Sequence, residues 1–344
     1  MLLTIHLTAP RCGRRFFLAV VLGAVAGLWT MPAAADSARH YRIAVACVNA
    51  DPSVRLEGLG FSCADVRTSF ELAARSFPVD LTFYDNHGER SIALSNVDDA
   101  IRNNVDLFIE YDPDPEVNAA VGSRLKAAGI PALAINYPIP GAPLYGADSA
   151  AAGWIAAEAL VQFAAANWRG AVAVAAIVGG ATPPEPIEAR ARGVAAGLRR
   201  AAPGISVTRL DASSMERLER SLTAFLNSER GKKILVAALD DRSALNAKEV
   251  IESAGRADDC VIVSQGLDRS IHGGMHEKKE ISPDNHTSIV LGAVAFYVDR
   301  YGYDVLPLAL RMLRGEAVPA RTSTRHVLVT PANVYREYPP SDLN

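Results

Sequence analysis

An apolar run that ends in glycines, AVAVAAIVGG from Ala171 to Gly180, constrains the fold more than any other part of this 344-residue chain. A segment that is apolar on both faces suits a parallel strand covered by helices on each side. The glycine pair frees the backbone where the strand leaves the sheet, and a helix-like segment with Arg190 and Arg192 follows. Open α/β sheets bind ligands outside the carboxyl ends of their strands, so this loop and helix start mark a candidate binding region.

Strands and helices alternate along the rest of the chain, which predicts doubly wound parallel sheets with right-handed crossovers. The expected strands are 41–49, 79–84, 105–111, 131–136, 171–179, 205–210, 233–239 and 261–264, and the expected helices are 62–75, 91–102, 116–128, 149–167, 188–200, 214–228 and 242–254. The pattern restarts at Ala171, which predicts two lobes with a cleft between them. After a polar segment from Arg269, a helix at 306–313 and a strand at 325–330 indicate that the chain crosses between the lobes more than once.

The first 35 residues have the features of a secretory signal peptide. Arg11, Arg14 and Arg15 precede the apolar run 16–28. Three alanines at 33–35 are the small residues that a signal-peptide cleavage site requires. This run is short for a membrane span, although an uncleaved anchor is the alternative, and the arginine pair leaves both Sec and twin-arginine export open. Removal of the segment leaves 32 basic and 38 acidic residues, a net charge of −6, with no basic block for nucleic acid.

Three cysteines, Cys47, Cys63 and Cys260, remain in a compartment that permits disulfides. Cys47 lies in an expected strand and Cys63 opens the next expected helix, so these two could pair; three buried reduced thiols are the alternative. None of them has a recognisable partner for nucleophilic chemistry.

Motifs of catalysis and metal binding do not emerge from the sequence. There is no Gly-x-Ser-x-Gly elbow and no His-Glu-x-x-His helix, so we expect no enzymatic activity and no cofactor. His272, His276 and His286 could hold a metal ion, but Gly273 and Gly274 argue against a stable helix there. A solvated loop without a metal is the expectation.

Short segments in one order over nearly the whole exported chain resemble the type 1 periplasmic binding proteins, specifically the sugar-binding, ribose-binding-protein-like branch. The segments are IAVACVN at 43–49, YGAD at 145–148 followed by Gly153, ARARG at 189–193, ALDD at 238–241, GLD at 266–268, and Tyr301-Gly302 through GEAVP at 315–319. The resemblance implies two doubly wound lobes joined by a three-crossing hinge, with crossings near 147–148, 296–298 and 322–324. It places residues 36–147 with 298–322 in an N-terminal lobe, and residues 148–297 with 323–344 in a C-terminal lobe.

The resemblance also implies ligand-binding positions in the cleft. Arg190 matches an arginine whose planar guanidinium grips sugar oxygens, although it could instead pair with Glu185 or Glu188 on the surface. Asp240 and Asp268 match strand-end acceptors of hydroxyl hydrogens, although a strand-end aspartate is also a common helix cap. The further candidates are Asn49, Asp51, Tyr111, Asp112 and Phe296.

One departure from the family concerns the aromatic side chain that stacks on the sugar. The segment Asn49-Ala50-Asp51-Pro52 stands where the family commonly has an Asn-Pro-Phe-like segment. Phe296, with Tyr297 beside it, falls where sugar binders often carry an amide, and Tyr111 and Trp154 could supply further rings. A sugar or a sugar-like, partly apolar ligand is therefore expected, and a small cyclic, lipid-like or aromatic ligand is the alternative.

The function that the resemblance implies is that of an exported, monomeric solute-binding protein of the periplasm. It would capture a small ligand between its lobes and deliver it to an ABC permease, by closure about the hinge. The alternative is a sensory protein of the same fold that presents its ligand state to a histidine kinase or a chemoreceptor.

Overall fold

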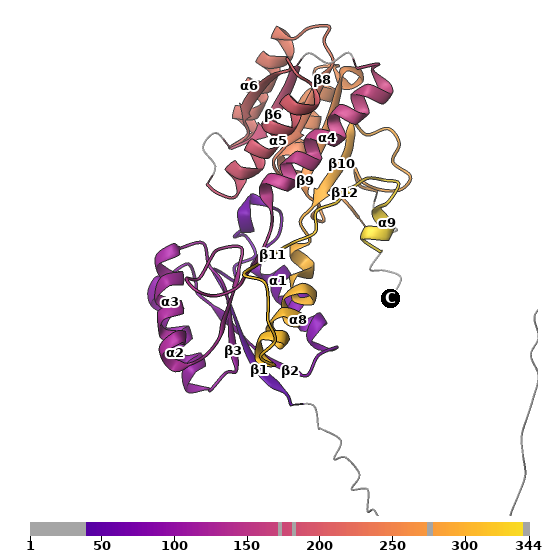
Figure 1. Cartoon of the computed structure of the whole chain (residues 1–344). Coiled ribbons are helices and arrows are strands. Elements are labelled where there is room, and N and C mark those ends of the chain that lie inside the picture. The colour runs from indigo at the N-terminus through magenta and orange to yellow at the C-terminus, as the bar shows by residue number, and fades with distance from the viewer. Residues whose placement is uncertain (1–38, 171–173, 181–183, 274–277, 340–344) are drawn as a thin grey trace, which may run out of the picture. The chain divides into compact units, whose positions relative to one another are not determined.

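The computed structural model describes residues 39–339, except for 171–173, 181–183 and 274–277 (Figure 1). The predicted signal peptide lies outside the described residues. The first sheet consists of six parallel strands in the order β11-β5-β4-β3-β1-β2. Its strands are β1 (Tyr41–Cys47), β2 (Val79–Asp85), β3 (Leu107–Tyr111), β4 (Ala132–Ile135), β5 (Leu144–Gly146) and β11 (Arg321–Ser323).

Helices cover both faces of this sheet, as a parallel sheet requires. The helices α2 (Arg90–Arg102) and α3 (Pro115–Ala128) pack on one face, where Ala44 and Phe108 are fully buried. The helices α1 (Cys63–Ala74) and α8 (Tyr301–Leu313) pack on the other face, against Val45 and Ile109. A short 3₁₀ helix, η1 (Leu56–Gly58), lies in the loop between β1 and α1.

The second sheet follows the same plan, in the order β12-β10-β9-β8-β6-β7. Its strands are β6 (Val174–Gly179), β7 (Ser206–Asp211), β8 (Ile234–Ala238), β9 (Cys260–Gly266), β10 (Val290–Ala295) and β12 (Leu328–Val329), the last of which is antiparallel to β10. The helices α4 (Ser149–Asn167) and α5 (Ile187–Ala201) share one hydrophobic cluster, and α6 (Met215–Ser228) and α7 (Asp241–Ser253) share another. Short helices η2 (Ala257–Asp259), η3 (Val298–Arg300) and α9 (Val334–Glu337) complete the described part.

The chain passes between the two sheets three times, from β5 to α4, from β10 to α8 and from β11 to β12 (Figure 1). The predicted fold class, two parallel-sheet α/β lobes, is therefore confirmed. The helix α4 has the length and hydropathy of a membrane span, but its apolar residues pack in the core that it shares with α5. Its Gly153 lies against the carbonyl of Arg190, and Gly193 of α5 lies against the carbonyl of Ala150.

Three expectations near the crossings need correction. The last long helix begins at Tyr301 rather than at 306 and includes Pro307. The expected strand 325–330 shortens to Leu328–Val329, because only these residues pair with β10. The segments β5 and β11, which the sequence indicated only as crossings, pair with each other as short strands, because their extended backbones lie side by side.

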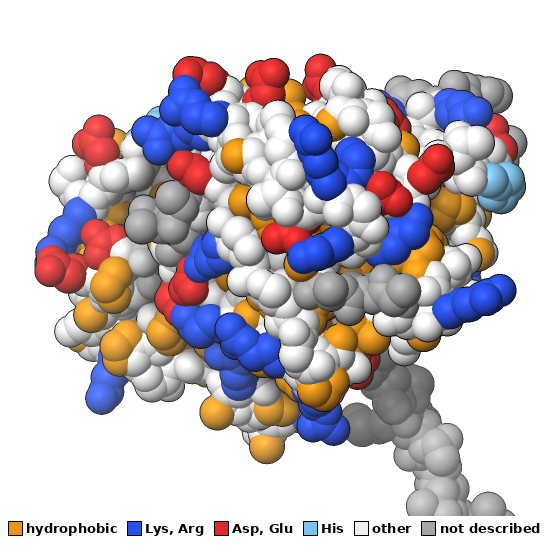
Figure 2. Space-filling view, turned by 90° about the horizontal axis from the view of Figure 1, so that it is seen from above, with side chains coloured by type: hydrophobic (Ala, Val, Ile, Leu, Met, Phe, Trp, Pro, Cys, Tyr) orange, Lys and Arg blue, Asp and Glu red, His pale blue; other side chains and the backbone are white. Residues whose placement is uncertain are grey.

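Basic and acidic side chains are interspersed on the face of the molecule that Figure 2 shows. Ion pairs such as Arg217–Asp211 and Arg220–Glu216 connect neighbouring charges on the surface. This distribution agrees with the absence of a basic block in the sequence.

Candidate functional site

Arg190 is the largest fully buried side chain described, and the α4–α5 contact fixes its backbone. Its Nη1 donates to the carbonyl of Leu239 at 2.5 Å, and its guanidinium lies 4.7 Å from the ring centre of Phe296. The surface pairing considered above is wrong, because Glu185 pairs with Arg192 and Glu188 pairs with Arg209. Burial lowers the pKa of Arg190 to about 10, so the side chain remains charged at neutral pH.

The Nε of Arg190 has no hydrogen-bond partner among the described residues. A buried N–H that lacks a partner carries the full cost of its desolvation, and this cost is higher for a charged group. Arg190 therefore has an unused donor that an oxygen of a ligand could satisfy.

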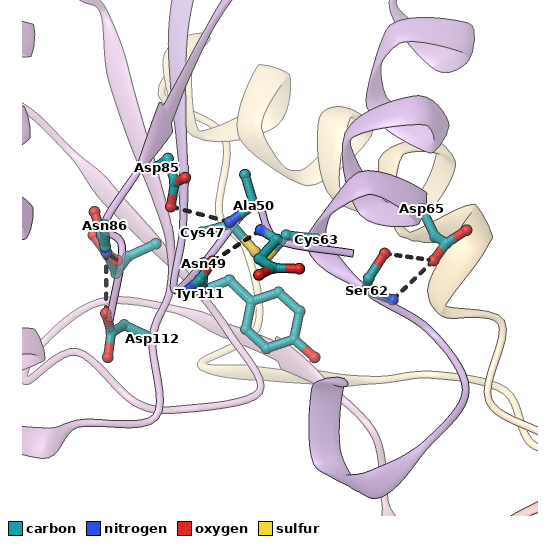
Figure 3. Close-up of a disulfide and its surroundings, with 12 residues drawn as sticks. Cys47, Asn49, Ala50, Ser62, Cys63, Asp65, Asp85, Asn86, Tyr111 and Asp112 are labelled. Atoms are coloured by element: carbon teal, nitrogen blue, oxygen red, sulfur yellow. Dashed lines mark hydrogen bonds between the residues drawn. A yellow bond between two sulfur atoms is a disulfide. The ribbon is translucent and has the colours of Figure 1, made fainter. Parts of the chain in front are cut away.

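The loop between β1 and α1 reaches this arginine. A disulfide joins Cys47 and Cys63, with their Cα atoms 6.1 Å apart, at the two ends of the loop (Figure 3), which confirms that pairing; Cys260 is free and buried. Within the loop, Leu56 donates its N–H to the carbonyl of Phe61 at 2.9 Å. The carbonyl of Glu57 accepts a hydrogen bond from Nη2 of Arg190 at 3.2 Å.

Tyr111, at the end of β3, faces the same loop from the first sheet. Its hydroxyl lies 2.6 and 2.7 Å from the two carboxylate oxygens of Glu57, and it accepts from Nδ2 of Asn136 at 2.9 Å. Removal from water raises the pKa of Glu57, against the lowering effects of Tyr111, Asn136 and Arg190. Burial and the nearby Glu57 also raise the pKa of Tyr137.

Three aspartates lie where strands β8 and β9 of the second sheet end. Asp240 caps α7, accepting from both the N–H and the hydroxyl of Ser243 at 2.7 Å. Asp241 accepts from the Ser264 hydroxyl at 2.5 Å and from the N–H of Asp268 at 2.7 Å. Burial raises the pKa of Asp240 and of Asp241. The carboxylate of Asp268 lies directly against Gly60 of the loop.

Phe296 and Tyr297 are adjacent in the sequence but face different surroundings. Phe296 is 1% exposed and lies between Arg190 and His326. The ring centres of Phe296 and His326 are 4.7 Å apart. Tyr297 adopts a positive φ of 53° and stacks on Tyr338, so it belongs to another cluster. Of these two rings, only that of Phe296 lies against Arg190.

The other candidates from the first lobe make local contacts. Asn49 accepts from the N–H of Asp51 at 2.8 Å, and Asp51 is an exposed residue that accepts from the N–H of Ser53. Asp112 is buried and accepts from Asn86 at 3.0 Å (Figure 3). The structure thus brings Tyr111, Arg190 and Asp268 around the loop, with Phe296 against Arg190. The hydrogen bonds of Asn49 and Asp51 support a turn, and that of Asp112 joins the ends of β2 and β3. Trp154 donates to Glu158 and lies beside Arg200 on the α4–α5 surface.

Three residues of this cluster, Glu57, Asn136 and Tyr301, were not among the ligand-binding candidates that the sequence provided. Asn136 directly follows β4, so its place as a polar residue at a strand end is the signal that could have found it. Tyr301 packs on Tyr145, with the two ring centres 5.1 Å apart. Glu57 lies in a loop without a recognisable motif, so its position depends on tertiary contacts.

No group of three His, Cys, Asp or Glu among the described residues could hold a metal ion. His276 lies outside the described residues. His272 packs on Tyr338, with ring centres 4.7 Å apart, and burial lowers its pKa to about 4.

Residues 62–317 match the family model described as a periplasmic binding protein domain. No curated protein matches the chain. A solute-binding protein of an ABC transporter from Actinobacillus succinogenes, with bound D-allose, superposes with a TM-score of 0.66 at 17% identity over 86% of this chain and 99% of the other. A protein from Mycobacterium smegmatis in complex with β-D-fucofuranose superposes with a TM-score of 0.63 at 23% identity, over 88% of this chain and 95% of the other. A fructose-binding periplasmic domain of a hybrid two-component system superposes with a TM-score of 0.62 at 18% identity, over 87% of this chain and 93% of the other.

Proposed function

Because this chain belongs to the periplasmic binding protein family, we propose that it is an exported solute receptor that binds a sugar or a sugar-like ligand between its two sheets. The unused Nε donor of Arg190, buried beside Phe296, is the observation that supports this proposal most directly. A planar guanidinium presents N–H groups that suit adjacent hydroxyl oxygens, and an aromatic ring offers a face to the apolar side of a sugar. Tyr111 and Asp268 would supply further polar contacts from the two sheets.

Delivery to an ABC permease in the periplasm is the role that we propose for the ligand-bound form. The two lobes, residues 36–147 with 298–322 and residues 148–297 with 323–344, would close about the three crossings on ligand binding. A sensory role is the second candidate, since the similar structures include a fructose-binding domain of a two-component system. Adjacent permease and ATPase genes would favour uptake, and an adjacent kinase gene would favour sensing.

Isothermal titration of the protein with D-allose, D-glucose, D-fructose and myo-inositol tests the proposal. Arg190→Ala should weaken binding of the preferred compound by about 1.5–3 kcal/mol, the value of hydrogen bonds from a charged donor. Arg192→Ala is the matched control, because Arg192 lies two residues away and is exposed. Equal affinity in wild type and Arg190→Ala would refute the role of Arg190. If the wild type binds none of these compounds, the proposed ligand class is wrong.

A further inference from the structure

We propose that the loop segment Arg55–Phe61 is a built-in occupant of the binding site, and that a ligand binds only after this segment withdraws. The inference rests on the proposed function, since it concerns the regulation of the same site. The segment lies between β1 and α1, and the Cys47–Cys63 disulfide ties the ends of the loop that contains it (Figure 3).

The segment supplies oxygens to the groups that would bind a ligand. The Glu57 carboxylate takes the hydrogen bond of the Tyr111 hydroxyl, at 2.6 Å for the nearer oxygen. The Glu57 carbonyl takes one N–H of Arg190, at 3.2 Å. One residue of the loop thus meets a polar group from each sheet, as a hydroxylated ligand in the cleft would do.

The segment also fills the space between these groups. Gly58 lies against the side chain of Ile187 at the start of α5, and Gly60 lies against the carboxylate of Asp268. Since a Cβ on either glycine would collide with these side chains, the backbone of the segment is in direct contact with α5 and with Asp268, which follows β9. A sugar could not reach Arg190 and Asp268 from this side while the segment stays in place.

Opposing contributions determine whether the segment stays in place. Leu56, Leu59 and Phe61 are at most 4% exposed, so apolar burial favours insertion. The positive φ of Glu57, 49°, and the removal of its carboxylate from water oppose insertion. A ligand that binds the free site shifts this balance toward withdrawal, and its apparent affinity falls in proportion to the fraction of molecules with a free site.

Two variants weaken insertion through different contacts. Phe61→Ala and Leu59→Ala each remove a buried apolar side chain that favours insertion. Both should bind the preferred compound among D-allose, D-glucose, D-fructose and myo-inositol more tightly than the wild type, by about tenfold or more, because more molecules have a free site. Glu219→Ala, at an exposed position of α6, is the control and should bind like the wild type.

Hydrogen exchange provides a readout that needs no sugar affinity. The N–H groups of Leu56 and Leu59 are bonded within the segment, to Phe61 and Leu56 respectively, so they should exchange slowly in the free protein. They should exchange faster in Phe61→Ala, and faster in the wild type when the preferred compound is bound.

Each outcome decides between the two proposals. Weaker or unchanged binding by both variants would show that the segment is part of the site or irrelevant to it, which overturns the inference and leaves the proposed function in place. Fast exchange of both amides in the free wild type would overturn the inference without any ligand. If neither the wild type nor the variants bind any of the four compounds, the sugar-binding function itself is wrong.

Discussion

Glu110 is a single residue whose surroundings conflict with its charge. It lies in the fully buried strand β3, and its Oε1 accepts from Nδ2 of Asn86 at 2.8 Å. Its Oε2 has no hydrogen-bond partner among the described residues. Desolvation, and then the nearby charge of Asp112, raise its pKa to about 8. Glu110 is therefore protonated in the folded protein at neutral pH.

This raised pKa predicts a loss of stability as the pH rises. In the unfolded chain Glu110 loses its proton near pH 4.5, the ordinary value, while in the folded protein it loses it near pH 8. Between these values the unfolded chain binds fewer protons, so the free energy of unfolding falls with increasing pH. Glu110→Gln removes this penalty and should be more stable than the wild type at pH 8 by on the order of 3 kcal/mol.

Urea unfolding at pH 5 and pH 8 measures this difference. Glu249→Gln, at an exposed position of α7, is the control and should have the free energy of unfolding of the wild type at both pH values. A Glu110→Gln protein with the same loss of stability as the wild type between pH 5 and pH 8 would contradict the assignment of this dependence to Glu110.

At the scale of elements, the contact between α4 and α5 determines where Arg190 lies. A Cβ on Gly193 would collide with the carbonyl and the Cα of Ala150, which are backbone atoms and cannot move alone. Gly193→Ala should therefore push the helices apart and destabilise the protein by about 1–3 kcal/mol, as overpacking of a core does. It should also weaken ligand binding, because Arg190 lies one turn before Gly193.

Gly180→Ala is the matched control for the effect on stability, since a Cβ at Gly180 would meet no atom within 4 Å. The free energy of unfolding in urea and the affinity for the preferred sugar are the two measurements. If Gly193→Ala has the free energy of unfolding and the sugar affinity of the wild type, the helix pair adjusts without displacing Arg190.

The elements were predictable from the sequence because their signals are local. The helix at 149–167 has the expected bounds, and the βαβ alternation predicts both sheets. The loop at Glu57 was not predictable, because its place depends on Tyr111, 54 residues away, and on Arg190, 133 residues away. Its conformation also requires a positive φ at a non-glycine residue, which no local pattern indicates. The ligand-binding roles of Arg190 and its neighbours stay predictions.

At the scale of the whole molecule, the Cys47–Cys63 disulfide acts on the unfolded chain as well as on the loop. The bond joins residues 16 positions apart, and a cross-link over a loop of about this size stabilises the folded state by about 3 kcal/mol, because it restricts the unfolded chain. The double substitution Cys47→Ala with Cys63→Ala should lower the free energy of unfolding by this amount.

A reducing agent separates the effect of the bond from that of the lost sulfur atoms. Dithiothreitol should destabilise the wild type toward the value of the double variant in urea unfolding, and it should leave the double variant unchanged. Cys260 is free and buried, so its thiol is present under both conditions and cannot account for a difference. Equal stability of oxidised and reduced wild type would contradict this prediction, because it would mean that the bond does not measurably restrict the unfolded chain.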